Sequence, residues 1–318
     1  LDTLNQIAKE LQKEKFKNGA IEFETEEVKF ELDDEGRPIR VFRKERKDTH
    51  KLIEEFMLLA NREVAEFMYK GIEKAKSKGA FVYRIHELPN KEKIINLAVF
   101  AKALGYNLDE EDGEVTAGAL NRLMKSIDGG VHESLIKTAT IRSMAKAVYS
   151  TRNIGHFGLG FTYYTHFTSP IRRYPDLMVH RLLFRFLNGG VIEQDEVAKY
   201  ERLSMEATQK EISASEAERA SIKYKQVEFM LGKIGQEFDA TISGVSEWGI
   251  YVEEVETKAE GMVRLRNMTD DMYILDEKNY CIVGTQKKKK YSLGDRVRVK
   301  LNDANLDKKI LDFALIQS

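Results

Sequence analysis

Residues 149–181 have the sequence YSTRNIGHFGLGFTYYTHFTSPIRRYPDLMVHR, and this stretch decides the fold around it. Ser169 and Pro170 are followed by apolar residues at helical spacing, namely Leu177, Met178, Leu182, Leu183 and Phe186. Serine is a favoured helix N-cap, and proline fits the first helical position, where its missing N–H costs nothing. The pattern therefore predicts a helix over residues 170–188 with Ser169 as its N-cap.

Two arginines, Arg172 and Arg173, lie in the first turn of this expected helix. At a helix start the unpaired N–H groups and the positive end of the helix dipole point outward, and together with two guanidinium groups they suit a phosphate. The alternative is a capped helix whose arginines pair with nearby carboxylates. On chemistry alone the two interpretations have equal weight.

The rest of the first domain mixes helical and strand patterns. We expect helices over 1–14, 49–78, 90–104, 116–127, 132–148 and 194–231, and strands in 20–24, 28–32, 39–43 and 81–87, with a turn at 33–36. In the helix over 49–78, apolar residues cover nearly the full circumference, so we expect it to be central and buried. Gly232 and Gly235 mark the boundary to a second domain.

The second domain, 233–318, has the features of a five-stranded OB barrel: short strands, frequent glycine and the run IGQEFDATISGVSEWGIYVEE. The chain is therefore expected to be an α+β protein with domains at 1–232 and 233–318. A length of 318 residues is enough for two domains with their own cores.

The composition limits the classes of function. The 51 basic and 52 acidic residues nearly cancel, so any affinity for nucleic acid must come from local patches. The single cysteine, Cys281, excludes a disulfide framework and fits a reducing cytoplasm; in its strand-like run we expect it to be buried rather than nucleophilic. No segment approaches the roughly 18 apolar residues of a membrane span, and no signal peptide is recognisable. We expect a cytoplasmic protein.

The glycines of Gly155-His156-Phe157-Gly158-Leu159-Gly160 do not have the GxGxxG spacing, and the lysine and hydroxyl of a P-loop are missing. We expect instead a loop whose backbone closely approaches neighbouring elements.

The stretch at 149–181 resembles the signature of the RNase II/RNase R (RNB) family of 3′–5′ exoribonucleases, from the C-terminal half of the catalytic domain. The similarity continues through GAIEF at 19–23, HKLIEEFMLLANREVA at 50–65, YRIHELP at 83–89, IRSMAKAVYS at 141–150 and SEAERA at 215–220. It is strongest to the bacterial RNase R branch. The resemblance implies part of an RNB catalytic domain that degrades single-stranded RNA processively to nucleoside 5′-monophosphates.

The resemblance assigns roles around the arginine motif. Arg172 matches the family arginine that contacts the scissile phosphate and stabilises the charge developing on it. Arg173 is expected to hold structure or the neighbouring phosphate, with Ser169 beside them. His156 and His166 are interpreted as structural, because hydrolysis with two bound metals does not require a histidine.

The resemblance also implies carboxylates that contact RNA. Glu55, or else Glu54, is expected to bind ribose hydroxyls at the RNA 3′ end, the contact that distinguishes RNA from DNA. The structural alternative pairs Glu55 with Arg62 or with an arginine from elsewhere in the chain. Glu218 matches a family carboxylate near the end of the RNA channel, with a surface charge on an amphipathic helix as an equal alternative.

Residues 233–318 resemble the RNA-binding OB domain of the ribosomal-protein-S-one type, through AEGMVRLRNM at 259–268 and YSLGDRVRVKLNDANLDKKILDFAL at 291–315. Trp248 and Tyr251 match the aromatics on which that family stacks bases, with Phe238 as a third. Without the family, one of the first two rings would be assigned to the core and the other to the surface.

The resemblance also places polar RNA contacts near Arg264, Asp303 and Lys308 or Lys309, although a histidine is more usual at the position of Arg264. The four charges of Lys287–Lys290 are expected in a loop. Such a run is usually solvated, but beside an OB face it could add phosphate contacts.

The aspartate-rich magnesium site of the family is absent from this chain. The acidic pairs at 33–34, 109–112 and 270–271 sit beside glycine or in polar loops, so we expect solvated turns. We therefore expect a C-terminal piece of a longer exonuclease, with its magnesium ligands in an upstream half of the same catalytic domain. The alternatives are a non-catalytic RNA-binding relative and one subunit of a split enzyme.

Overall fold

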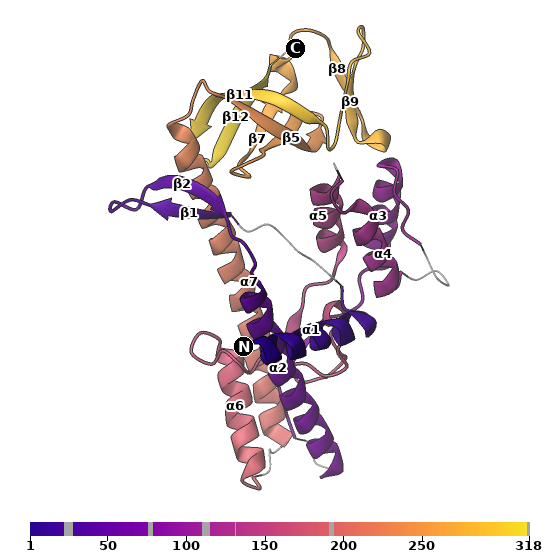
Figure 1. The fold of residues 1–318 in the computed structure, drawn as a ribbon, viewed down its shortest axis with the longest axis vertical. Coiled ribbons are helices and arrows are strands. Elements are labelled where there is room, and N and C mark those ends of the chain that lie inside the picture. The colour runs from indigo at the N-terminus through magenta and orange to yellow at the C-terminus, as the bar shows by residue number, and fades with distance from the viewer. Residues whose placement is uncertain (22–27, 76–78, 110–114, 131, 191–193, 317–318) are drawn as a thin grey trace.

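The computed structural model describes residues 1–21, 28–75, 79–109, 115–130, 132–190 and 194–316. A helical part with two small sheets and a closed barrel are linked by the long helix α7 (Gln194–Leu231), which runs from the lower helices up to the barrel (Figure 1). The α+β class is confirmed, and α7 has the predicted bounds.

The chain opens with α1 (Asp2–Lys17), which ends three residues later than predicted and lies against α2 (Asp48–Lys74). Between them β1 (Val28–Leu32) and β2 (Pro38–Arg43) form an antiparallel hairpin. Its turn is built by the Asp33 carboxylate, which accepts the N–H groups of Glu35 and Arg37 at 2.9 and 2.8 Å. These two strands and the turn are confirmed. Residues 22–24 of the strand expected at 20–24 lie outside the described residues.

Helix α2 is less buried than predicted. Ala65 and Met68 are fully buried in a cluster with α6 and α7, whereas Ile53 and Phe67 remain 57% and 49% exposed. The expectation of a helix buried all round is wrong for the described part of the chain, because α1, α6 and α7 cover only part of its circumference.

A three-helix group follows: α3 (Lys91–Ala103), α4 (Ala117–Ile127) and α5 (Glu133–Ser143). Asn90 and Thr116 cap α3 and α4 with their side chains, so both predicted helices are confirmed. The helix expected over 132–148 is wrong at its end, because Val148 leaves the helix and pairs with Ile85. This pairing of β3 (Tyr83–Ile85) with β4 (Val148–Ser150) spans three residues, which also shortens the strand expected over 81–87.

The C-terminal part is the predicted five-stranded barrel. Its strands close in the order β11 (Arg296–Asn305), β12 (Ile310–Leu315), β7 (Glu260–Arg264), β6 (Gly249–Glu254) and β5 (Glu237–Ser246). Fully buried apolar residues fill it, namely Ile242, Ile250, Val252, Val263, Val299 and Phe313. The barrel prediction is confirmed.

A separate three-stranded sheet, β8 (Tyr273–Asp276), β9 (Cys281–Gly284) and β10 (Lys290–Ser292), is inserted between β7 and β11. Cys281 is fully buried in β9, as expected. Lys290 lies in β10 rather than in the loop predicted for the four lysines. Among the described helices, none has both the length and the apolar character needed to cross a bilayer.

Candidate functional site

The arginine motif forms a turn, not the first turn of a helix. Helix α6 (Tyr174–Leu187) begins four residues later than predicted, with Arg173 as its N-cap and Pro175 in its first turn. The prediction that Ser169 caps the helix is wrong. The Ser169 carbonyl instead accepts the N–H groups of Arg172 and Arg173 at 3.3 and 3.1 Å, which closes the turn. Asp176, inside the first helical turn, accepts the Ser169 N–H at 2.7 Å.

The two arginines of the turn have different surroundings. Nη2 of Arg173 donates to Oδ1 of the fully buried Asp176 at 2.8 Å. The side chain of Arg172 is exposed and makes no hydrogen bond or ion pair with the part of the chain that the structure describes. Each of the two alternatives from the sequence thus applies to one residue: Arg173 pairs with a carboxylate, and Arg172 presents a free cation.

His156 and His166 are partly buried, and both rings pack against the ring of Tyr164. The Tyr149 hydroxyl lies 2.7 Å from Nδ1 of His166. Burial lowers the pKa of His156 to about 3, and burial together with repulsion from Arg173 lowers the pKa of His166 to about 2. Both imidazoles are therefore neutral at pH 7, which fits the structural interpretation.

The lowered pKa values of these two histidines lead to an expected dependence of the free energy of unfolding on pH. The unfolded chain protonates them near the ordinary pKa of 6.5, whereas the native protein keeps them neutral, so unfolding takes up protons and the free energy of unfolding falls as the pH falls below 6.5. Urea titrations between pH 7 and 5, above most carboxylate titration, should show this loss, at most about 1.4 kcal/mol per pH unit for each imidazole. The variant His166→Gln, which can still accept from Tyr149, should have a shallower slope; an unchanged slope would contradict the assignment.

The two candidate ribose carboxylates line a cavity of ≈ 320 Å³ between α1, α2 and the loop at 157–159. Glu55 is only 5% exposed and forms an ion pair with Lys15 of α1, itself 8% exposed. Glu54 is partly exposed and pairs with Arg46. The prediction that Arg62 pairs with Glu55 is wrong, because Nη2 of Arg62 lies instead 3.1 Å from Oε1 of Glu63.

The third candidate carboxylate, Glu218, lies in the middle of α7, where residues 213–219 are all exposed. It has no hydrogen-bond or ion-pair partner among the described residues. The structure therefore leaves this side chain free for a contact from outside the chain.

On the barrel, the structure brings two of the three predicted aromatics to the surface. Trp248, in the turn between β5 and β6, is 75% exposed, and Tyr251 of β6 is 36% exposed. Phe238 differs, since it is partly buried against the hydrophobic core. Its position near the start of β5, opposite the fully buried Val299, places it with the core rather than with the exposed rings.

The predicted polar contacts of the barrel lie on its outer surface. Arg264 of β7 forms a two-pronged pair with Asp312 of β12, at 3.1 and 3.3 Å. Asp303 is the cross-strand neighbour of Asp312 and is exposed. Lys308 is exposed in the β11–β12 turn, where its N–H donates to Asn305. Arg264 is therefore already engaged by a carboxylate, whereas Asp303 and Lys308 are open to solvent.

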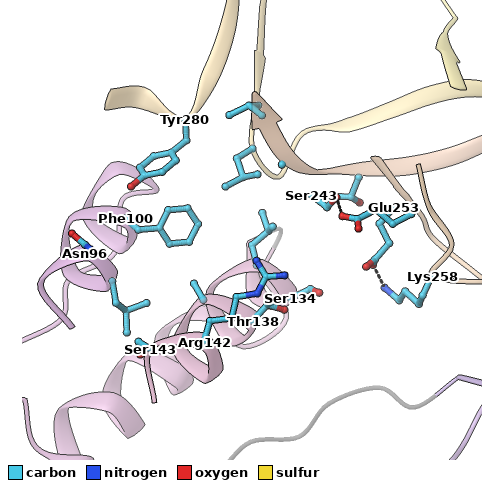
Figure 2. Close-up of a pocket in the computed structure, with 18 of the residues that line it drawn as sticks. Asn96, Phe100, Ser134, Thr138, Arg142, Ser143, Ser243, Glu253, Lys258 and Tyr280 are labelled. Atoms are coloured by element: carbon cyan, nitrogen blue, oxygen red, sulfur yellow. Dashed lines mark hydrogen bonds and ion pairs between the residues drawn. The ribbon is translucent and has the colours of Figure 1, made fainter. Parts of the chain in front are cut away.

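A larger cavity of ≈ 760 Å³ lies between α3, α5 and the barrel (Figure 2). Helix α5 lines it with Ser134, Thr138 and Arg142, spaced four residues apart, and Arg142 has no hydrogen-bond or ion-pair partner among the described residues. Gly244, the cross-strand neighbour of Tyr251, lies on the barrel side. Sequence reasoning missed this cavity, although the four-residue spacing of polar side chains on α5 was a signal for it.

Within the described ranges, no three His, Cys, Asp or Glu side chains converge on one point. The Asp271 carboxylate accepts the N–H groups of Gln286 and Lys287 at 3.1 and 2.6 Å, and so shapes a loop as Asp33 does. Residues 110–112 of the acidic run at 109–112 lie outside the described residues.

Comparison with known families places the chain. The RNB domain model matches residues 1–189, and the S1 RNA binding domain model matches residues 232–315. The chain belongs to the RNB family. Among curated relatives, ribonuclease R of Aquifex aeolicus is 36% identical over 319 residues, which cover 100% of this chain and 44% of the relative. Ribonuclease R of Escherichia coli K12 is 34% identical over 328 residues, covering 100% and 40%. The chain thus spans less than half the length of these relatives.

Solved structures agree with this placement in the RNB family. The apo form of Mycoplasma genitalium RNase R superimposes with a TM-score of 0.89 and 26% identity, covering 99% of this chain and 49% of that one. The same enzyme in complex with ribose-methylated single-stranded RNA gives a TM-score of 0.88. Yeast Ssd1, described as a pseudonuclease, shares the fold at a TM-score of 0.59 and 22% identity.

Proposed function

We propose that residues 1–318 are the C-terminal part of a 3′–5′ exoribonuclease that degrades single-stranded RNA processively to nucleoside 5′-monophosphates. The observation that carries the proposal is the unpaired, exposed Arg172 on a turn anchored to a buried carboxylate. A fixed cation at a phosphate stabilises negative charge that develops during bond cleavage. Membership of the RNB family supports this role.

We propose that the RNA 3′ end lies between Arg172 and the cavity of Glu54 and Glu55. Glu54 is the more accessible carboxylate, and Glu55 is available only beside Lys15, its buried partner. A carboxylate accepts hydrogen bonds from ribose hydroxyls, which DNA lacks at the 2′ position. Both residues remain candidates for this contact.

We propose that RNA reaches this region from the barrel. Trp248 and Tyr251 offer exposed rings for base stacking. Gly244, opposite Tyr251, borders the cavity between α5 and the barrel, where Arg142 is free to contact a phosphate. The exposed Glu218 on α7 lies between the two parts and is a further candidate contact.

Magnesium ligands are proposed to lie in an upstream half, which would supply the aspartates that the described residues lack. The exposed apolar side chains of α2, among them Ile53 and Phe67, offer a surface on which that half could pack. The chain's own contribution is then the arginine turn, the ribose carboxylate and the RNA-binding barrel.

A non-catalytic RNA-binding relative is the second candidate, because this fold also occurs in a protein described as a pseudonuclease. A split enzyme, with the aspartates on a separate subunit, is the third. These candidates differ from the first only in where, or whether, the metal site exists.

The deciding experiment combines degradation and binding. A 5′-labelled single-stranded RNA is incubated with this chain alone and with the protein that also carries the upstream half, each with magnesium, beside a binding titration. Binding by both proteins with mononucleotide release by the longer one alone supports the proposal. Release by residues 1–318 alone would show a complete active site here and overturn it, and failure of the longer protein to cleave would favour the non-catalytic relative.

Removing the exposed rings of the barrel should weaken RNA binding. Trp248→Ala and Tyr251→Ala are each expected to cost about 1–3 kcal/mol of binding free energy, because each removes a stacking surface. The affinity of residues 1–318 for oligouridine and oligoadenine of equal length measures the effect. Tyr224→Ala, which removes an exposed ring on α7, is the matched control; an equal loss there would mean that the barrel face is not the binding surface.

A further inference from the structure

Arg172 lies in the segment 167–173, to which side chains of α2 and α6 are hydrogen-bonded. Asp176 and His180 are four residues apart on α6 and therefore lie on the same face of that helix. Nε2 of His180 lies 2.9 Å from the Phe167 carbonyl, and its ring stacks on that of Phe167 at 4.2 Å. From α2, Oδ1 of Asn61 accepts the Phe167 N–H at 2.9 Å. One end of the segment is thus fixed by two helices.

At the other end of the segment, Asp176 supplies the side-chain contacts. Its Oδ1 accepts both the Ser169 N–H, at 2.7 Å, and Nη2 of Arg173, at 2.8 Å. These contacts bracket the backbone of Arg172, since the turn between Ser169 and Arg173 is closed by its own hydrogen bonds. The backbone before and after Arg172 is therefore fixed, and only its side chain remains free to turn.

The network around Asp176 is incompletely satisfied. Oδ2 of Asp176 and Nε of Arg173 are buried and have no hydrogen-bond partner among the described residues. Leaving such atoms unpaired costs stability, and native proteins keep few of them. A carboxylate needed only to complement the helix dipole in the first turn of α6 could do so from an exposed position, so burial of this one calls for another reason.

We propose that Asp176 is a positioning residue for Arg172, assisted by His180. Its buried charge holds Arg173 and the Ser169 N–H inward, and this fixes the backbone position from which the Arg172 guanidinium reaches the RNA phosphate. The inference rests on the proposed function, because it assigns a residue to the arginine's task there. A small displacement of a catalytic group can cost about 10²-fold in rate.

The variant Asp176→Asn keeps the size of the side chain and removes its charge. In the protein with the upstream half, we expect kcat to fall about 10–100-fold with little change in KM, since the RNA-binding surface is untouched. Adding Asp176→Asn to Arg172→Ala should lower kcat no further, because the residue acts through Arg172. The proposal would be overturned if the losses of kcat in the two single variants multiplied in the double variant. It would also be overturned if Asp176→Asn left kcat unchanged.

Two further variants separate positioning from folding. His180→Phe keeps the stack on Phe167, removes the hydrogen bond and should show a smaller loss of kcat. Glu133→Gln is the matched control: Glu133 also lies in a first helical turn and accepts a loop N–H, from Gly129 at 2.8 Å, and a cation, from Lys137 at 2.6 Å. It should lose stability without losing kcat. An equal loss of kcat in Glu133→Gln would show that the effect comes from folding.

A readout on residues 1–318 does not depend on activity. Hydrogen exchange of the Ser169, Arg172 and Arg173 amides should speed up in Asp176→Asn, while the middle of α6 keeps its protection. Unchanged exchange would overturn the positioning role even if activity fell. If instead Arg172→Ala leaves kcat unchanged, the proposed function fails at this residue, and the exchange result still reports whether Asp176 holds the turn.

Discussion

Arg172→Ala, in the protein that also carries the upstream half, is expected to lower turnover of single-stranded RNA by about 10²–10³-fold. Removing one fixed donor from a developing negative charge has that size of effect on kcat. The affinity for RNA should change little, because Arg172 is one exposed cation outside the barrel. The variant should therefore lower turnover without lowering RNA affinity, as expected when an interaction is stronger in the transition state than in the ground state.

The measurement is single-turnover cleavage of a labelled oligonucleotide beside equilibrium binding of the same RNA. Arg181→Ala serves as the control, since Arg181 is an exposed arginine on α6, a short distance along the chain. If Arg172→Ala lost affinity and turnover to the same extent, Arg172 would be a binding residue and not a catalytic one.

Lys15→Met is expected to lower the free energy of unfolding of residues 1–318 by about 3–5 kcal/mol. Lys15 and Glu55 are 8% and 5% exposed and form an ion pair between α1 and α2. Methionine nearly preserves the volume but leaves the Glu55 carboxylate buried without its cation. The loss is therefore mainly the cost of an uncompensated buried charge.

A denaturant titration measures this effect, and two variants interpret it. Lys13→Met breaks an exposed pair with Glu10, at 72% and 73% side-chain exposure, and should change stability by less than about 1 kcal/mol. The double variant Lys15→Met/Glu55→Met replaces the pair by apolar side chains and should recover most of the loss. If Lys15→Met behaved like Lys13→Met, the buried pair would not hold α1 on α2.

Local chemistry and periodicity in the sequence determined most of the helices, the hairpin and the barrel. Asn90 and Thr116 cap their helices as side chains of that type do in any context. The alternating strands of the barrel carry the apolar residues that fill it, so their pattern is sufficient to predict it. The candidate residues of the arginine motif could also be identified from the sequence, because the motif is a continuous run of residues.

Tertiary structure decided where that motif ends and the helix begins. Ser169 and Pro170 have the chemistry of a helix start, but α6 begins at Tyr174 with Arg173 as its N-cap and Pro175 in its first turn. The buried Asp176 carboxylate accepts the Ser169 N–H and so holds Ser169 in the preceding turn. Tertiary structure also separated Arg172 from Arg173, paired Glu55 with Lys15 forty residues away and placed Phe238 against the core. Each of these outcomes depends on which side chains meet across elements, and a single sequence contains no local signal of such encounters.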